Sequence, residues 1–207
     1  MGAATERNRS VGNRPDPALS VLVPATSGSY NRICGVGSRM SGCEIVEGYR
    51  PGVVGRLTEL HATYYGNRWE LGSQFEVDIG TGIAAFVDRY DPSRDGLWTV
   101  VDDGRVMGGI VIDSRTDREN VAQLRYFILD PAVHGQGLGR GLLDEAMAFC
   151  RQRGFDEVFL WTVDELEAAI RLYHDAGFEA TDEVDPHTGW QTTVPYRRFE
   201  CDLSAVE

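Results

Sequence analysis

The sequence contains no lysine, so all 20 of its Lys and Arg residues are arginines. A P-loop, which wraps nucleotide phosphates, needs a lysine followed by serine or threonine after its glycines. The absence of lysine therefore excludes that class of nucleotide site. Positive charge is also scarce, because these arginines face 32 acidic residues and the net charge is −12. We expect no nucleic-acid partner for so acidic a chain.

The negative charge lies in one part of the chain. Residues 1–40 carry 5 arginines and 2 acidic residues, which leaves 15 arginines and 30 acidic residues, a net charge of −15, for residues 41–207. Such a body would attract a cationic amine by long-range steering. For most of these carboxylates, a solvated surface is the simpler interpretation.

Cysteines and long apolar runs are few. The four cysteines are far apart and lack the short spacing of metal ligands (Cys34, Cys43, Cys150 and Cys201). We therefore expect free thiols in a reducing cytoplasm and no metal. No run approaches the ~18 apolar residues of a membrane span, so we expect no membrane association. The short run at 18–25 is interrupted by Ser20, which argues against a secretory signal.

Residues 124–151 form the stretch around which the chain is organised. The apolar run Leu124–Leu129 indicates a buried strand that ends at Asp130-Pro131. Four glycines then alternate with other residues across 135–141, and apolar residues follow at helical spacing. A glycine turn at a helix N-terminus presents backbone N–H groups and partial positive charge, which favour a pyrophosphate. The dinucleotide fingerprint is not matched, because Arg140 stands where its third glycine is required.

This stretch resembles the central motif of the GNAT superfamily of acyl-CoA-dependent N-acetyltransferases, which reads Arg or Gln, two residues, Gly, one residue, and Gly or Ala. The matching residues are His134, Gly135, Gln136, Gly137, Leu138 and Gly139, with His134 as a departure at the first position. Residues 159–183 are similar to the strand, helix and LYxxxGF turn that close the family's active site. The chain is also similar to acetyltransferase domains fused to MarR-type regulators. It shows no winged-helix segment ahead of the motif, so we infer no DNA binding.

The resemblance implies acetyl-CoA as the acyl donor, bound between two diverging strands, with no metal. The backbone of Phe127, Ile128 and Leu129 would pair with the pantetheine arm. The turn would hold the pyrophosphate through His134, Gly135, Gln136, Gly137, Leu138, Gly139 and Arg140. Tyr173 matches the family's proton donor to the CoA thiolate, and a phenol with a pKa near 10 suits that role. The alternative for Tyr173 is a packed aromatic side chain.

Periodicity and turn residues predict an α+β fold with three layers (α/β/α). Strands are expected at 44–49, 97–101, 105–112, 124–129, 157–163, from 178 and at 195–203; helices are expected at 53–66, 71–90, 137–153 and from Asp164 or its neighbour to 177. The Asp-Gly turn at 103–104 predicts a hairpin, and the strand-helix-strand unit predicts a parallel pair. The sheet is therefore mixed and mostly antiparallel, and the resemblance adds the wedge between its parallel strands. We expect a disordered tail at 1–40 and a single acetyltransferase domain at 41–207.

The resemblance to the GNAT superfamily implies that the first two predicted helices border the acceptor site. The candidate acceptor residues are His61, Tyr64, Tyr65, Trp69, Glu70 and Glu76, although aromatic residues at helical spacing are more often part of a core. His61, Glu70, Glu76 and His187 are the candidates for a general base, and the sequence selects none of them. Arg125 lies in the apolar central strand, so its charge needs a partner. A structural ion pair or a carboxylate on the acceptor would supply one.

The predicted function is transfer of an acetyl group from acetyl-CoA to a primary amine, in a ternary complex with a small acceptor. Two alternatives stay open. One is acetylation of a protein or peptide, and the other is a module that binds acyl-CoA as a sensor without turnover. The oligomeric state is also open, a homodimer included.

Removal of residues 1–39 is expected to cost little, because that segment has too little apolar surface to offset the entropy of ordering. A chain that starts at Met40 should keep the melting temperature and the acetyl-CoA affinity of the full chain. A large loss of either would show that the segment packs on the domain or completes the site.

Overall fold

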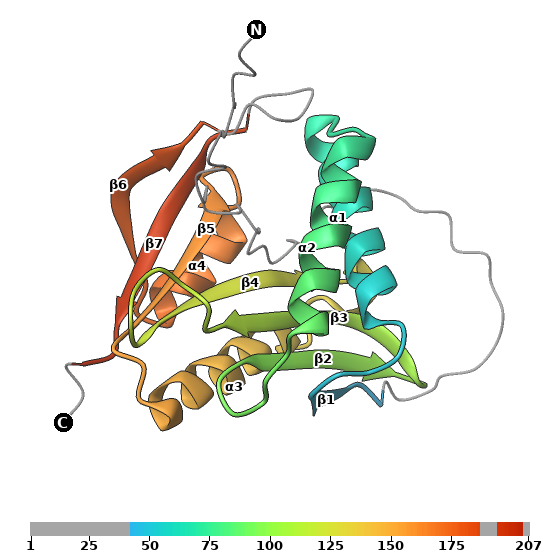
Figure 1. Cartoon of the computed structure of the whole chain (residues 1–207). Helices are drawn as coiled ribbons and strands as arrows, with labels where there is room; N and C mark the ends of the chain where they lie inside the picture. Colours follow the sequence, from blue (N-terminus) through green and yellow to red (C-terminus); the bar gives the residue numbers. More distant parts are fainter. Residues whose placement is uncertain (1–41, 187–193, 205–207) are drawn as a thin grey trace, which may run out of the picture.

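The computed structural model describes residues 42–186 and 194–204 (Figure 1). The tail expected at 1–40 and the base candidate His187 lie outside these residues. Seven strands form one sheet in the order β1-β2-β3-β4-β5-β7-β6. Their bounds are Glu44–Glu47, Gly96–Asp102, Arg105–Asp113, Val121–Leu129, Glu157–Val163, Glu179–Asp185 and Tyr196–Asp202 for β1 to β7.

Every neighbouring pair in this sheet is antiparallel except β4 and β5. The mixed, mostly antiparallel sheet with one parallel pair is therefore confirmed. The β2–β3 hairpin closes through Asp103 and Gly104, both with positive φ, as the Asp-Gly pair predicts for a two-residue turn.

Helices cover both faces of the sheet, which confirms the three-layer arrangement. Helices α1 (Val53–Trp69) and α2 (Ser73–Asp88) lie together on one face, and α1 contacts β3 and β4. Helix α3 (Leu138–Arg153) lies on the other face, against β1, β2 and β3 (Figure 1). Helix α4 (Glu167–Asp175) follows β5, and a short 3-10 helix, η1 (Pro131–Val133), follows β4.

Two details of the predicted secondary structure differ from the observed fold, the N-terminal cap of α4 and the start of β4. The first is the cap of α4, which begins after Leu166 without a side-chain cap. The Asp164 carboxylate instead accepts from the Arg197 guanidinium of β7, so the prediction that Asp164 or its neighbour caps this helix is wrong. The second is the start of β4 at Val121, three residues before the predicted start.

The charge of Arg125 is neutralised within the fold. Its Nη1 lies 2.9 Å from the Asp113 carboxylate, which also pairs with Arg89 at the end of α2. Its Nη2 donates to the Tyr126 hydroxyl at 2.8 Å. The expected structural ion pair is confirmed, and it ties β4 to β3 and α2.

Two cysteines of the described residues, Cys150 and Cys201, are buried free thiols. Burial raises the pKa of Cys150 to about 12, which makes it an inert core side chain. Cys34 lies outside the described residues. Across 42–186 and 194–204, we find no helix that combines the length and apolar character needed to cross a bilayer.

Candidate active site

The parallel strands β4 and β5 separate after a short contact. They pair only at Val121 with Glu157, Ala122 with Val158 and Gln123 with Phe159. Beyond these residues, β5 continues along β7 to Val163, and β4 continues along β3. The carboxyl-terminal half of β4 therefore has a backbone edge that no described strand covers. Open edges of this kind pair with extended ligands.

A bulge in β4 accompanies this separation. Arg125 stands opposite Val111 and Ile128 opposite Gly109, so Ile110 faces both Tyr126 and Phe127. Tyr126 has φ 51°, a conformation that bulky residues rarely adopt. A bulge bends its strand and increases the local twist, which accounts for the departure of β4 from β5.

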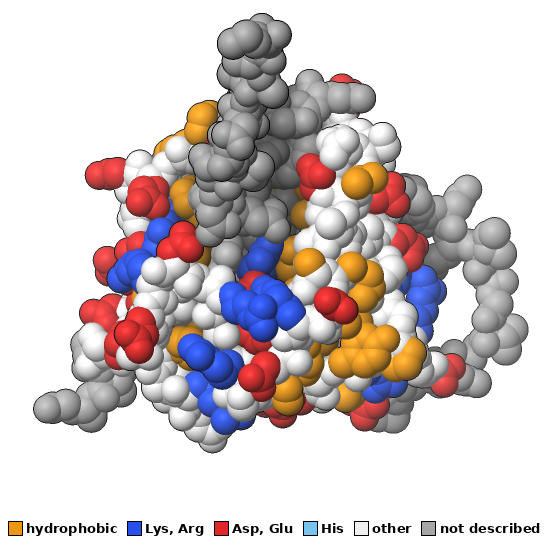
Figure 2. Space-filling view, in the orientation of Figure 1, with side chains coloured by type: hydrophobic (Ala, Val, Ile, Leu, Met, Phe, Trp, Pro, Cys, Tyr) orange, Lys and Arg blue, Asp and Glu red, His pale blue; other side chains and the backbone are white. Residues whose placement is uncertain are grey.

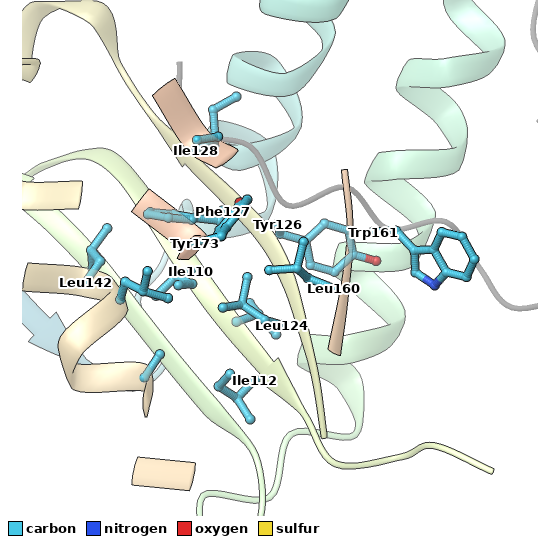
Figure 3. Packing of buried hydrophobic residues seen from close by; sticks show 14 of the residues in the cluster. Ile110, Ile112, Leu124, Tyr126, Phe127, Ile128, Leu142, Leu160, Trp161 and Tyr173 are labelled. Atoms are coloured by element: carbon cyan, nitrogen blue, oxygen red, sulfur yellow. The ribbon is translucent and has the colours of Figure 1, made fainter. Parts of the chain in front are cut away.

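The open edge of β4 carries two backbone N–H groups. The Asp130 N–H donates to the Met107 carbonyl of β3 at 2.7 Å. Alternation along the strand then turns the N–H groups of Leu129 and Phe127 toward the gap, and that of Ile128 toward β3. Of the three residues predicted to meet the pantetheine arm, Phe127 and Leu129 thus present donors to the gap. All three side chains are buried, and Figure 3 shows Phe127 and Ile128 in the core.

The glycine turn lies at the end of this edge. Asp130 caps η1 by accepting from the Ala132 N–H at 2.9 Å, and Arg56 of α1 holds the same carboxylate. Gly135 and Gly137 have φ 74° and 77°, a left-handed conformation that favours glycine at both positions. Gly137 is the N-cap of α3 and offers no side-chain cap, which leaves the first N–H groups of the helix for a ligand.

The remaining residues of the predicted phosphate turn have different surroundings. Gln136 is exposed, Leu138 is half-buried and Gly139 is buried within α3. The exposed Arg140 forms an ion pair with Asp175, which connects α3 to α4. The turn therefore presents backbone groups to a ligand rather than a cluster of cationic side chains.

His134 is half-buried and contacts the open edge. Its Nε2 lies 3.1 Å from the Leu129 carbonyl, so Nε2–H donates, and Nδ1 carries the lone pair with no partner among the described residues. Burial lowers the pKa of His134, while the bond to Leu129 and the charge of Asp130 act in the opposite direction. The imidazole is accordingly neutral at pH 7.

Tyr173 of α4 brings a phenol to the same region. Its side chain is fully buried, and its ring centroid lies 6.3 Å from that of Phe127 (Figure 3). Its oxygen has no hydrogen-bond partner among the described residues. Burial raises the pKa of Tyr173 well above its ordinary value, so the phenol keeps its proton at neutral pH and is a donor.

The acceptor candidates separate by burial. His61 and Tyr65 are fully buried, Tyr64 and Trp69 are half-buried, and Glu70 and Glu76 are exposed. The His61 Nδ1–H donates to the Leu57 carbonyl at 2.8 Å, which leaves Nε2 as the basic nitrogen. His61 is thus the only candidate base that the described residues place in the interior.

Sequence reasoning missed the bulge at Tyr126, since no glycine or proline marks it.

Comparisons with known proteins agree with this geometry. A model of the acetyltransferase (GNAT) family matches residues 55–178, more than half of the chain. The uncharacterised N-acetyltransferase YjgM of Escherichia coli is 35% identical over 101 residues, which are 48% of this chain and 60% of that protein. A mycothiol acetyltransferase of Beutenbergia cavernae is 37% identical over 91 residues, which are 43% of this chain and 29% of that protein.

The chain thus spans less than two thirds of the length of these curated relatives.

Solved structures extend the similarity over the fold. The yncA protein of Salmonella typhimurium, solved with its cofactor acetyl-CoA, has a TM-score of 0.60 and 20% identity, covering 81% of this chain and 97% of that chain.

Proposed function

Because the chain belongs to the acetyltransferase (GNAT) family, we propose that it transfers an acetyl group from acetyl-CoA to a small primary amine in a ternary complex. The separation of β4 from β5 carries this proposal. Further support comes from a helix N-terminus behind a glycine turn and from a buried, protonated phenol that packs on Phe127 of the uncovered edge. These groups fit the pantetheine arm, the pyrophosphate and the departing sulfur of an acyl-CoA.

Each step of the reaction has a group of this chain suited to it. The Phe127 N–H on the open edge would stabilise the oxyanion that develops when the amine attacks the thioester carbonyl. The carbon–sulfur bond then breaks, and the Tyr173 hydroxyl gives its proton to the thiolate. The nitrogen loses a proton, for which His61 Nε2 is the buried candidate. The proposed products are an amide and free CoA.

The distribution of surface charge does not indicate where a cationic acceptor would bind. On the face shown in Figure 2, carboxylates are spread over several elements and interleaved with arginines. That distribution supports the interpretation of most acidic residues as a solvated surface. The net charge is therefore compatible with a cationic acceptor. On this face, however, the described residues form no acidic patch that would bind one.

A panel of acceptors assayed for release of the CoA thiol tests the proposal. We expect turnover with at least one small primary amine. Turnover with peptides or proteins alone would favour protein acetylation. Because this sequence contains no lysine, it would add no acetyl-lysine signal of its own to that assay. Tight acetyl-CoA binding without turnover would favour a sensor.

His134 provides a pH-dependent test of the phosphate turn. A bound pyrophosphate would favour protonated His134, whose pKa burial lowers, so the affinity for acetyl-CoA should increase as pH falls through the acidic range below neutrality. We expect an increase on the order of tenfold between pH 7.5 and 5.5, measured by calorimetry. His134→Gln should lose this increase and retain only the part that comes from titration of the ligand. Equal pH profiles for the two proteins would contradict a contact between His134 and the phosphates.

A further inference from the structure

Two fully buried tyrosines have hydroxyl groups without a partner among the described residues. They are Tyr173 of α4 and Tyr65 of α1, and both side chains are 0% exposed. Folded proteins satisfy nearly all buried polar groups, so two orphaned hydroxyls in one region need an explanation. The proton donor described above accounts for Tyr173. It leaves the hydroxyl of Tyr65 unexplained.

Tyr173 contacts the β4 bulge directly, and Tyr65 is connected to it through His61. The Tyr65 ring stacks on His61 with centroids 6.3 Å apart, and the His61 ring meets Tyr126 edge-on at 6.2 Å. Tyr173 meets the next residue, Phe127, at 6.3 Å. The bulge of β4 is therefore reached from α1 through His61 and Tyr65, and from α4 through Tyr173.

Burial raises the pKa of both phenols. Burial raises the pKa of Tyr65 well above its ordinary value, and the nearby phenols of Tyr196, Tyr173 and Tyr64 raise it further. Tyr65 consequently keeps its proton, and its oxygen retains lone pairs that accept hydrogen bonds. An acceptor of this kind suits the N–H of an amine that must aim its own lone pair at the thioester carbonyl.

Aromatic rings surround Tyr65. Its ring centroid lies 5.0 Å from that of Phe75, 5.2 Å from Trp69 and 5.4 Å from Tyr64. The buried carboxylates of the described residues are engaged elsewhere, Asp95 with Ser114 and Asp113 with Arg125. The described surroundings of Tyr65 therefore offer rings and a hydroxyl, rather than a buried carboxylate that would hold a second cationic group.

We propose that Tyr65 positions the acceptor, by accepting a hydrogen bond from its amine, and that the preferred acceptor carries an aromatic or similarly flat apolar group beside the amine. This inference rests on the proposed acetyl transfer and names the substrate class of the same site. Tyr65 acts on the attacking nitrogen, whereas Tyr173 acts on the departing sulfur. Changes at the two tyrosines should accordingly affect different kinetic constants.

Tyr65→Phe tests the role of the hydroxyl while the ring is kept. We expect the KM for the amine to rise about tenfold, which corresponds to one lost hydrogen bond, with the KM for acetyl-CoA unchanged. The melting temperature should stay the same or rise, because the substitution removes a buried hydroxyl that has no partner. Tyr90→Phe is the matched control, since Tyr90 follows α2, is half-buried and packs on Phe86. It should leave all three quantities unchanged.

The acceptor class is tested with the wild-type protein and three amines, phenethylamine, butylamine and spermidine. We expect kcat/KM to be at least about tenfold higher for phenethylamine than for either of the others. Turnover of amines with an unchanged KM in Tyr65→Phe would overturn the role of Tyr65, and so would a fall of several degrees in melting temperature. A preference for spermidine would overturn the acceptor class. Absence of CoA release with every amine would refute the proposed acetyl transfer to small amines, and this inference with it.

Discussion

Tyr173→Phe is expected to lower kcat about a hundredfold and to leave the affinity for acetyl-CoA nearly unchanged. The substitution keeps the ring that packs on Phe127 and Phe199 but removes the proton proposed for the CoA thiolate. General acid catalysis commonly contributes a factor of this size. Steady-state kinetics gives kcat, and calorimetry gives the dissociation constant of acetyl-CoA.

Stability separates this outcome from a simple packing effect. The Tyr173 hydroxyl is buried without a partner among the described residues, so its removal should not lower the melting temperature. Tyr90→Phe again serves as the control. If Tyr173→Phe turned over at the wild-type rate, with chemistry shown to be rate-limiting, Tyr173 would be a packing residue. The thiolate would then leave unprotonated or take its proton from water.

Local signals predicted most of the fold. Strand β5 has the predicted bounds, Glu157–Val163, because it is a short apolar run between a helix end and a polar turn. The β2–β3 turn follows from Asp103-Gly104, whose residues tolerate positive φ. The end of α3 at Gly154 follows from the left-handed conformation that a helix C-cap favours. Each of these features depends on residues adjacent in sequence.

Features that depend on distant residues were not predictable in the same way. Asp164 is a good capping residue, but Arg197 lies close enough in the folded sheet to take its carboxylate. The bulge at Tyr126 has no local marker, since the residues from Leu124 to Leu129 form an ordinary apolar strand in sequence. Its position reflects the close approach of β4 that Gly108 of β3 allows. A Cβ at Gly108 would lie 2.3 Å from the Ile128 carbonyl oxygen.

The candidate site shows the same difference between local features and features that depend on distant residues. The glycine motif identifies the turn, because positive φ at Gly135 and Gly137 requires a particular residue type. The acceptor side has no such motif, and its six sequence candidates were equivalent until burial distinguished them. His61 and Tyr65 lie inside, whereas Glu70 and Glu76 lie at the surface. Chemistry that depends on backbone conformation was thus easier to predict than chemistry that depends on which side chains converge.

Gly137→Asp is expected to weaken acetyl-CoA binding about a hundredfold. Gly137 stands at the N-terminus of α3, where the pyrophosphate would meet the free N–H groups. A carboxylate there would bind to those groups itself and would repel the ligand, and two like charges about 4 Å apart interact by ~4 kcal/mol at an effective dielectric constant near 20. Part of this repulsion is enough for the expected loss, which calorimetry would measure.

Gly137→Asn separates charge from shape, because it has nearly the same size and the same tolerance of the left-handed conformation as aspartate. No described atom lies within 4 Å of a Cβ at this position, and both substitutions carry the same strain of the left-handed backbone, so the two variants are matched in everything except charge. We expect Gly137→Asn to lose only a small part of the affinity that Gly137→Asp loses. Unchanged acetyl-CoA binding by folded Gly137→Asp would place the pyrophosphate elsewhere, and equal losses in both variants would show that shape, rather than charge, governs binding at this turn.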